Sequence, residues 1–201
     1  MELAIATNNA DKAQEFSRIL APLGIRTRSM KELGVTLDVE ETGSVFEENA
    51  YLKAKALFEV LHAPVVADDS GIEVDALDGR PGVYTARYAG EHATDEENID
   101  KLLKDMEHVP QNQRTARFVC ALCVILNAKE QFFLRGTCEG TIGYARAGEG
   151  GFGYDPVFYI GGRSFAQLAD GEKDAVSHRG HALRLLQEEL RRRLNRQGAE
   201  E

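Results

Sequence analysis

The stretch VVADDSGIEV, residues 65–74, joins a β-branched run typical of a buried strand to two adjacent acids. Removing ionised carboxylates from water without compensation costs several kcal/mol or more. Asp68 and Asp69 therefore require neighbouring groups that hold their charge.

Side chains of a strand alternate between its two faces, so Asp69 shares a face with Val65 and Ala67 while Asp68 points to the other side. We expect the strand to end at the acids and Gly71 to let the chain turn. The carboxyl ends of strands in α/β sheets commonly bind ligands, and Mg²⁺ suits a carboxylate there. Asp69 is the preferred ligand. The alternative is that either acid only caps a turn.

Strands and helices alternate on the N-terminal side of this stretch. A strand is predicted at 2–7, a helix follows up to Gly24, and a short strand is predicted at 25–29. A second helix is expected to begin near Thr42 or Gly43. Its first turn would carry the acids Glu40, Glu41, Glu47 and Glu48. We interpret Glu47 and Glu48 as acids that complement the helix dipole.

On the C-terminal side, a helix is predicted at about 95–106. Two long strands at 115–126 and 131–145 are joined by a polar turn, which indicates an antiparallel ribbon. A last helix carries an apolar face of Leu183, Leu186, Leu190 and Leu194. This order predicts an α/β fold with a central mixed sheet and flanking helices.

The chain has 201 residues and is expected to form one domain over residues 1–201. No apolar run approaches the roughly 20 residues that cross a bilayer, and the opening MELAIATNN is too short for a signal peptide. We expect a cytoplasmic protein without a membrane partner. The formal net charge of −9 argues against a nucleic-acid partner and leaves a small ligand or a metal.

Cys120 and Cys123 form a C-x-x-C match that could indicate zinc or redox chemistry. They lie in the strand-like run RFVCALCVIL, where positions three apart face opposite sides. We interpret both as small core residues.

The first candidate site is TNNADK, residues 7–12, between a strand and a helix. Free N–H groups at a helix start favour phosphate, and Thr7, Asn9 and Lys12 add donors and a cation. The stretch lacks the glycines of a Walker loop. An ordinary helix cap is the alternative.

A second candidate is GEGGFGYDP, residues 148–156, which matches G-x-G-x-x-G by count but is followed by strand-like residues rather than a helix. Its composition predicts a loop that presents Phe152, Tyr154 and Asp155 to a base. The alternative is a hairpin-like turn whose aromatic residues belong to the core.

The third candidate is EKDAVSHRGHAL, residues 172–183, where Lys173, His178 and Arg179 gather hydrogen-bond donors. His178 and His181 are three residues apart, as in some metal sites. Gly180 weakens the helix there and no third ligand is evident, so a metal is not expected at this point.

Five stretches in order resemble the inosine triphosphate pyrophosphatase family, which hydrolyses non-standard purine nucleoside triphosphates. They are ATNNADK, EETGSVFEENAYLKA, ADDSGIEVDALDGRPGVYTARYAG, GGFGYDPVF and SHRGHAL, and they are spread from residue 6 to residue 183, along nearly the whole chain. The resemblance implies a central mixed sheet, two lobes around a long cleft, and a homodimer. It also implies Mg²⁺-dependent hydrolysis of ITP, dITP or XTP to the monophosphate and pyrophosphate.

The resemblance further implies roles for individual residues. Asp69 would be the general base and a metal contact, and Glu41 a second metal contact, with the share of Glu40 left open. The triphosphate would be held by Thr7, Asn8, Asn9, Ala10, Asp11, Lys12, Lys53 and Ser70. The base pocket would consist of Phe152, Gly153, Tyr154, Asp155, Lys173, His178 and Arg179.

Donors from His178 or Arg179 would bond a 6-oxo group and reject the amine of adenine. Guanine also carries the 6-oxo group, and the sequence does not indicate what excludes it. Asn8 stands where the family motif usually has glycine, and asparagine tolerates a positive φ if the loop needs one. A sensor that binds the triphosphate without turnover, and a phosphatase acting on small esters, are the competing hypotheses.

Overall fold

The computed structural model describes residues 1–197 as a seven-stranded sheet in the order β2-β1-β3-β4-β5-β6-β7. β1 pairs in parallel with β2 and β3, and the remaining neighbours are antiparallel. The predicted α/β fold with a central mixed sheet is confirmed. The strands are β1 (Glu2–Ile5), β2 (Arg26–Ser29), β3 (Val65–Val74), β4 (Thr115–Asn127), β5 (Glu130–Ile142), β6 (Phe158–Ile160) and β7 (Arg163–Ser164).

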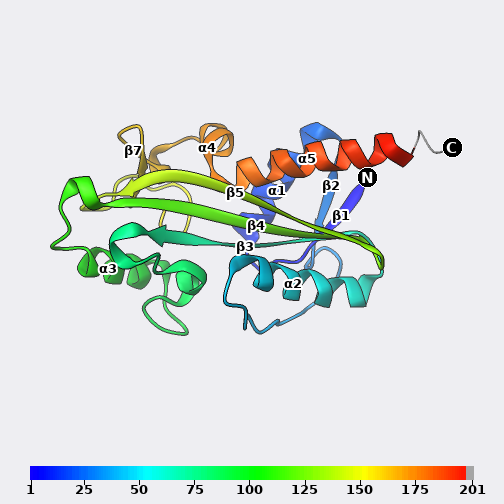
Figure 1. Cartoon of the computed structure of the whole chain (residues 1–201), viewed down its shortest axis with the longest axis horizontal. Coiled ribbons are helices and arrows are strands. Elements are labelled where there is room, and N and C mark those ends of the chain that lie inside the picture. Colours follow the sequence, from blue (N-terminus) through cyan, green and yellow to red (C-terminus); the bar gives the residue numbers. More distant parts are fainter. Residues whose placement is uncertain (198–201) are drawn as a thin grey trace.

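Helices cover both faces of the sheet, with α1, α4 and α5 on one side and α2 and α3 on the other (Figure 1). The 3-10 turn after α1 ends at Gly24, which takes the left-handed conformation that the sequence predicts for a helix stop. The helices are α1 (Ala10–Leu20), α2 (Phe46–Leu61), α3 (Asp95–Asp105), α4 (Asp170–Val176) and α5 (His178–Gln197).

β3 does not end at the acids, which corrects the prediction from the sequence. It continues to Val74 and pairs with β4 at every position, with Asp68 opposite Leu122 and Asp69 opposite Ala121. The long ribbon of β4 and β5 supplies backbone partners beyond the acids, so the strand has no reason to stop there. The parallel partner β1 does stop, because its register with β3 reaches only Val66. The acids thus lie just beyond the carboxyl end of β1.

The prediction that α2 begins near Thr42 or Gly43 is also wrong, because the helix begins at Phe46 after the extended residue Val45. The carboxylate of Glu48 accepts hydrogen bonds from the backbone N–H and the hydroxyl of Ser44, which satisfies donors ahead of the helix. Glu41 consequently lies in the extended segment before α2 and not in its first turn.

Two apolar cores lie on opposite faces of the central strands. Cys120 packs with α1 and α5 on one face, and Cys123 packs with α2 on the other, as predicted for core residues. Leu183, Leu186 and Leu190 of α5 are buried in the first of these cores, while the side chain of Leu194 lies outside the described residues. A third core joins α3 to the half of the sheet that carries β6.

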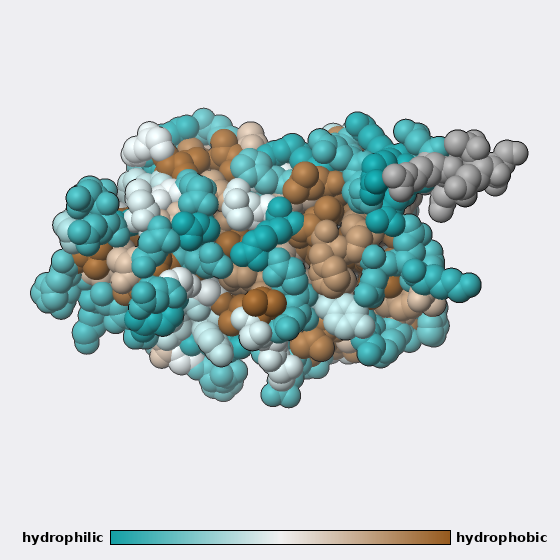
Figure 2. Space-filling model, viewed as in Figure 1, coloured by the Kyte–Doolittle hydropathy of each residue, from teal (hydrophilic) through white to brown (hydrophobic). Residues whose placement is uncertain are grey.

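The surface is mostly hydrophilic on the face shown in Figure 2, with hydrophobic residues gathered below α5 along the long strands. Phe133 of β5 and Leu185 of α5 are among the exposed large apolar residues. Within residues 1–197, no helix has both the length and the apolar composition that a membrane span requires.

Candidate active site

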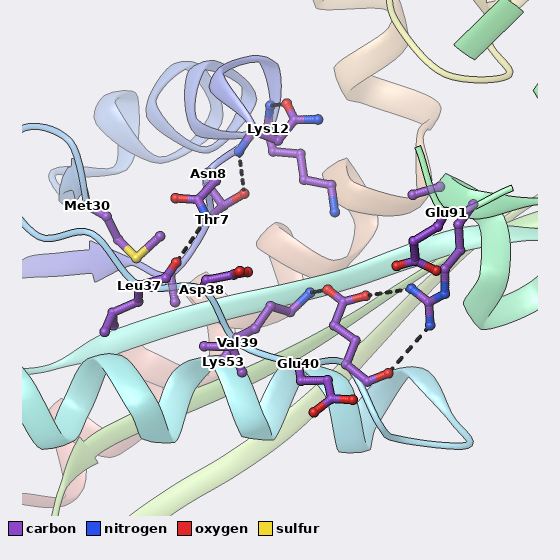
Figure 3. Close-up of a pocket in the computed structure, with 15 residues that line it drawn as sticks. Thr7, Asn8, Lys12, Met30, Leu37, Asp38, Val39, Glu40, Lys53 and Glu91 are labelled. Atoms are coloured by element: carbon purple, nitrogen blue, oxygen red, sulfur yellow. Dashed lines mark hydrogen bonds and ion pairs between the residues drawn. The ribbon is translucent and has the colours of Figure 1, made fainter. Parts of the chain in front are cut away.

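A cleft of about 730 Å³ lies beyond the carboxyl end of β1 (Figure 3). One wall is the loop before α1 and the other is the segment around Arg87. Its lining includes three cations, Lys12, Lys53 and Arg87, and four acids, Asp38, Glu40, Glu41 and Glu91. This mixture suits a ligand that carries phosphates and a cation.

The loop before α1 is held by its own side chains. The carbonyl oxygen of the Asn9 side chain accepts from the Lys12 N–H at 3.0 Å and caps α1, while the Thr7 hydroxyl accepts from the Asn9 N–H at 3.1 Å. The Asn8 side chain donates to the Leu37 carbonyl at 3.1 Å, which ties the loop to the segment leading to Glu41 (Figure 3).

Two carboxylates converge on the ammonium group of Lys53. Its Nζ lies 2.8 Å from Asp69 Oδ1 and 2.9 Å from Glu41 Oε1. The other oxygen of Asp69 accepts from the side chain of Asn49 at 3.2 Å, and Asn49 is itself fully buried on α2. Burial raises the pKa of Asp69, an effect that Lys53 and Lys12 only partly offset. A raised pKa moves a carboxyl group toward the range of a general base.

Asp68 lies on the opposite face of β3 and joins a buried network of charges. It pairs with Lys12 at 2.8 Å and with Arg179 of α5 at 2.9 Å. Burial alone would raise the pKa of Asp68, but Arg179 and Lys12 hold it well below its usual range. Asp68 therefore stays ionised and fixes one cation from α1 and one from α5.

Glu15 of α1 completes this network of buried charges. Its carboxylate pairs with Arg179 and, at 2.9 Å, with Lys173 of α4. Lys173 also pairs with Asp155 at 2.7 Å, and its ammonium lies 4.7 Å from the centre of the Phe152 ring. Buried charges are tolerated when they are paired in this way.

A smaller cavity of about 120 Å³ adjoins the cleft and shares Asn9, Lys12 and Ala86 with it. Ring atoms of Phe118, Phe152 and His178 line this cavity. His178 stacks on Phe118 with ring centres 4.7 Å apart. Burial and the nearby Arg179 hold the pKa of His178 well below its usual range, so the ring is neutral and offers one donor and one acceptor.

The far wall of the cleft is the 3-10 helix Gly82–Arg87, which rests on β3 at Gly71. A Cβ at Gly71 would lie 2.4 Å from the Thr85 hydroxyl and 2.6 Å from the Gly82 carbonyl oxygen. At the end of this segment, Arg87 Nη1 lies 3.6 Å from the Glu41 carboxylate. The close approach at Gly71 thus brings a guanidinium group to the acids of the cleft.

Comparison with known proteins agrees with this geometry. The family model described as Ham1 family matches residues 3–189. The chain belongs to the Ham1 family. A dITP/XTP pyrophosphatase of Geobacillus kaustophilus is 51% identical over 94% of this chain and 93% of its own length. That of Bacillus subtilis is 46% identical over 92% and 94%.

Solved Ham1 structures share the fold. A HAM1 protein from Coxiella burnetii superposes with a TM-score of 0.85 at 39% identity, covering 96% of this chain and 99% of the other. The Ham1 protein of Staphylococcus aureus gives a TM-score of 0.83 at 44% identity, covering 95% and 98%. The family resemblance read from the sequence is confirmed.

In this Ham1 protein, most residues predicted for the site do meet at the two cavities. The cleft takes Thr7, Asn8, Asn9, Lys12, Glu41 and Lys53, and the small cavity takes Ser70, Phe152, Gly153, Tyr154, Asp155, Lys173, His178 and Arg179. Ala10 lies on a groove at the other side of the loop, and Asp11 is exposed and lines neither cavity.

Several local expectations are refined by this Ham1 structure. Tyr154 is 2% exposed and packs in the third core, as the alternative prediction of core aromatic residues expects. It also lines the small cavity. Asn8 does not have a positive φ, so asparagine carries no backbone strain there. Glu41, and not the exposed Glu40, pairs with Lys53.

Three residues around the site were missed from the sequence. Glu15 and Asn49 look like ordinary helix residues. Each is a polar side chain next to an apolar stripe position, and this was the only sequence feature that could have indicated burial. Arg87 lies in one of the stretches that resemble the family, but its local pattern does not indicate a role, because only the fold of the 82–87 segment brings it to the cleft.

Proposed function

We propose that this protein hydrolyses non-standard purine nucleoside triphosphates, such as ITP, dITP and XTP, to the monophosphate and pyrophosphate. The observation that carries the proposal is the junction of two cavities. A charged cleft with three cations adjoins an aromatic cavity, and Asn9, Lys12 and Ala86 line both. Relatives that match nearly the whole chain bear the name dITP/XTP pyrophosphatase. Removal of such nucleotides would keep them out of DNA and RNA.

Asp69 is the proposed general base. Asn49 and Lys53 fix its two oxygens, and its raised pKa favours acceptance of a proton from water that attacks the α-phosphorus. Lys12 and Lys53 then neutralise the charge that develops on the leaving pyrophosphate. Arg87 faces the same cleft and is proposed as a third cation for this purpose.

Mg²⁺ is the proposed cofactor, with Asp69 and Glu41 as its protein contacts. Both carboxylates lie within 2.9 Å of one cation, the Lys53 ammonium, so their oxygens are close enough to share a metal ion that takes the place of that ammonium. Residues 1–197 contain no cluster of three or more side chains suited to hold a metal, so phosphates and water would supply the other ligands. Bound there, the ion would polarise the phosphate and acidify water.

The small cavity is proposed to hold the purine. Phe152 offers a ring face, and neutral His178 offers a donor to the 6-oxo group. Arg179 is already bonded to Glu15, Asp68 and Ser70, and Lys173 to Glu15 and Asp155. We propose that these two cations mainly shape the pocket and its electrostatic potential. They are less suited to bond the base, because each would first have to lose a present partner.

The decisive experiment is a panel of ATP, GTP, ITP, dITP and XTP with identification of both products, with and without Mg²⁺. We expect pyrophosphate from the last three and little turnover of ATP and GTP. Release of orthophosphate, or binding of ITP without any turnover, would contradict the proposal.

We further propose a single-domain chain that forms a homodimer and acts in the cytoplasm. The family resemblance supports the dimer, and exposed apolar residues such as Phe133 are of the kind that subunit contacts cover. Sedimentation equilibrium of the full chain tests the dimer, since a monomer mass at micromolar concentration would contradict it.

A further inference from the structure

A partly buried hydrogen bond ties the loop at the small cavity to the far wall of the cleft. The hydroxyl of Tyr154 donates to the Thr85 carbonyl oxygen at 2.8 Å. Burial raises the pKa of Tyr154, so the hydroxyl keeps its proton and remains a donor. The neighbours of Tyr154 in the chain, Gly153 and Asp155, line the small cavity.

Thr85 is the fixed point of the 3-10 helix Gly82–Arg87. Its hydroxyl accepts from the Ile72 N–H of β3 at 2.9 Å and donates to the Gly82 carbonyl at 2.6 Å. Thr85 is thereby attached to β3 through its side chain and to the 148–156 loop through its backbone. Two anchors at one residue fix the backbone that leads to Arg87.

The guanidinium group of Arg87 is held only loosely by its own contacts. The distances are 3.6 Å to the Glu41 carboxylate and 3.5 Å to the Glu41 carbonyl oxygen, and the Tyr84 ring centre lies 5.1 Å away. Contacts of that length do not fix a long side chain. The position of Arg87 in the cleft therefore depends on its backbone, and so on Thr85.

A second link between the same two segments is exposed. The Asp95 carboxylate accepts from the Gly153 N–H at 2.7 Å at the protein surface. Loss of a partner at a partly buried carbonyl, such as that of Thr85, costs more than loss at an exposed group, where water replaces it. The Tyr154 bond is thus the stronger of the two constraints.

We propose that the Tyr154 hydroxyl is a positioning group that couples the base cavity to the phosphate cleft by fixing Thr85 and, through it, Arg87. A base held by the 148–156 loop then favours the arrangement in which Arg87 faces the phosphates. The inference rests on the proposed function, in which Arg87 is a phosphate contact. It assigns to Tyr154 an effect on the cavity that it does not line.

The test separates the two cavities by using two products as probes. Magnesium pyrophosphate and inosine monophosphate are titrated separately into the wild-type protein and Tyr154→Phe by calorimetry. We expect Tyr154→Phe to bind pyrophosphate about five- to tenfold more weakly, since one partly buried hydrogen bond is lost, and to bind inosine monophosphate nearly as well as wild type. A role confined to the base pocket would give the opposite pattern.

A double-mutant cycle tests the route through Arg87. In an Arg87→Gln background, Tyr154→Phe should leave the affinity for pyrophosphate unchanged, because the group that it positions is gone. Tyr88→Phe is the matched control. It removes a hydroxyl that bonds the Asp105 carboxylate at 2.5 Å beside the same segment, and it should leave both affinities unchanged.

Thr85→Val is a second variant in case Tyr154→Phe does not fold. It removes the link to β3 and should weaken pyrophosphate binding in the same way, while Thr85→Ser should restore it. Equal pyrophosphate affinities in wild type and Tyr154→Phe, additive effects in the cycle, or a wild type that does not bind pyrophosphate would overturn the inference. The proposed function is judged separately by turnover of ITP in the wild type.

Discussion

Asp68 and Asp69 are adjacent carboxylates with opposite surroundings. Asp68 is surrounded by Lys12 and Arg179 and is held ionised, whereas burial dominates at Asp69 and raises its pKa. Because the strand turns them to different faces, Asp68 organises cations on one face, while Asp69 bonds Lys53, a residue that lines the cleft, on the other. The pair illustrates how a strand can place two acids in separate roles.

Asp69→Asn is expected to lower kcat for ITP by about 10²- to 10⁴-fold, the usual contribution of a general base. The fold and the binding of nucleotide should persist, because the amide is isosteric. Pyrophosphate release under saturating ITP is the measurement. Asp75→Asn, an exposed acid just after β3, is the control and should retain full activity. Near wild-type turnover of Asp69→Asn would exclude Asp69 as the base.

Glu15→Gln is expected to reduce the free energy of unfolding by about 3 kcal/mol at pH 7, because it removes a buried partner of Arg179 and Lys173. Burial tends to raise the pKa of Glu15, but those two cations outweigh burial and lower it below 4.5. A carboxyl group whose pKa is lower in the folded than in the unfolded protein stabilises the folded state at pH values above its unfolded pKa. This stabilisation is lost as the pH falls below about 4.5.

Urea unfolding between pH 3 and pH 7 measures this effect. The wild type should lose stability toward acid more steeply than Glu15→Gln, so the two curves should converge at low pH. Glu188→Gln, an exposed position on α5, should differ from the wild type by less than about 0.5 kcal/mol. A constant gap between wild type and Glu15→Gln across the range would contradict the assigned role.

At the scale of elements, β3 and the 3-10 helix Gly82–Arg87 form one unit through Gly71. The glycine was expected to let the chain turn, yet it lies within the strand, and the space above it is occupied by Thr85 and Gly82. The sequence shows that this position is a glycine, but the local pattern does not show why. The groups that approach Gly71 come from a later segment of the chain.

Gly71→Ala is therefore expected to destabilise the protein by about 1 to 3 kcal/mol and to lower turnover, since the new methyl group displaces the segment that carries Arg87. Thermal unfolding and ITP hydrolysis are the measurements. Gly171→Ala on α4 is the matched control, because no atom lies within 4 Å of the added carbon. It should be neutral or slightly stabilising. Equal effects of the two substitutions would argue against the close contact at Gly71.

Element types were predictable where a local pattern decides them. The Leu stripe of α5 and the paired long strands gave a helix and an antiparallel ribbon, both confirmed. Ends of elements were less predictable. β3 passed its acids because β4 offered backbone partners, and α2 began late because Glu48 satisfies the N–H of Ser44 ahead of the helix.

At the scale of the whole molecule, apolar cores hold the sheet and its helices together, while the lining of the cleft is mostly polar, with Ala6 and Met30 of one core at its wall. A cation bound by Asp69 and Glu41 would thus serve catalysis rather than folding. Treatment with EDTA is expected to abolish pyrophosphate release and to change the melting temperature by less than a few degrees. Restored turnover on adding Mg²⁺ is the control. Unfolding by EDTA would contradict the assignment of the cation to catalysis rather than to folding.

The sequence by itself determined the α/β class, the family, the opposite faces of Asp68 and Asp69 and the candidate residues, because these follow from local periodicity and short motifs. Only the tertiary structure decided which candidates share a cavity. Glu15 joins Lys173 and Arg179 across more than 150 positions of the chain, and Arg87 meets Glu41 across 46. Contacts between such distant positions depend on sheet order and helix packing, which no local pattern encodes.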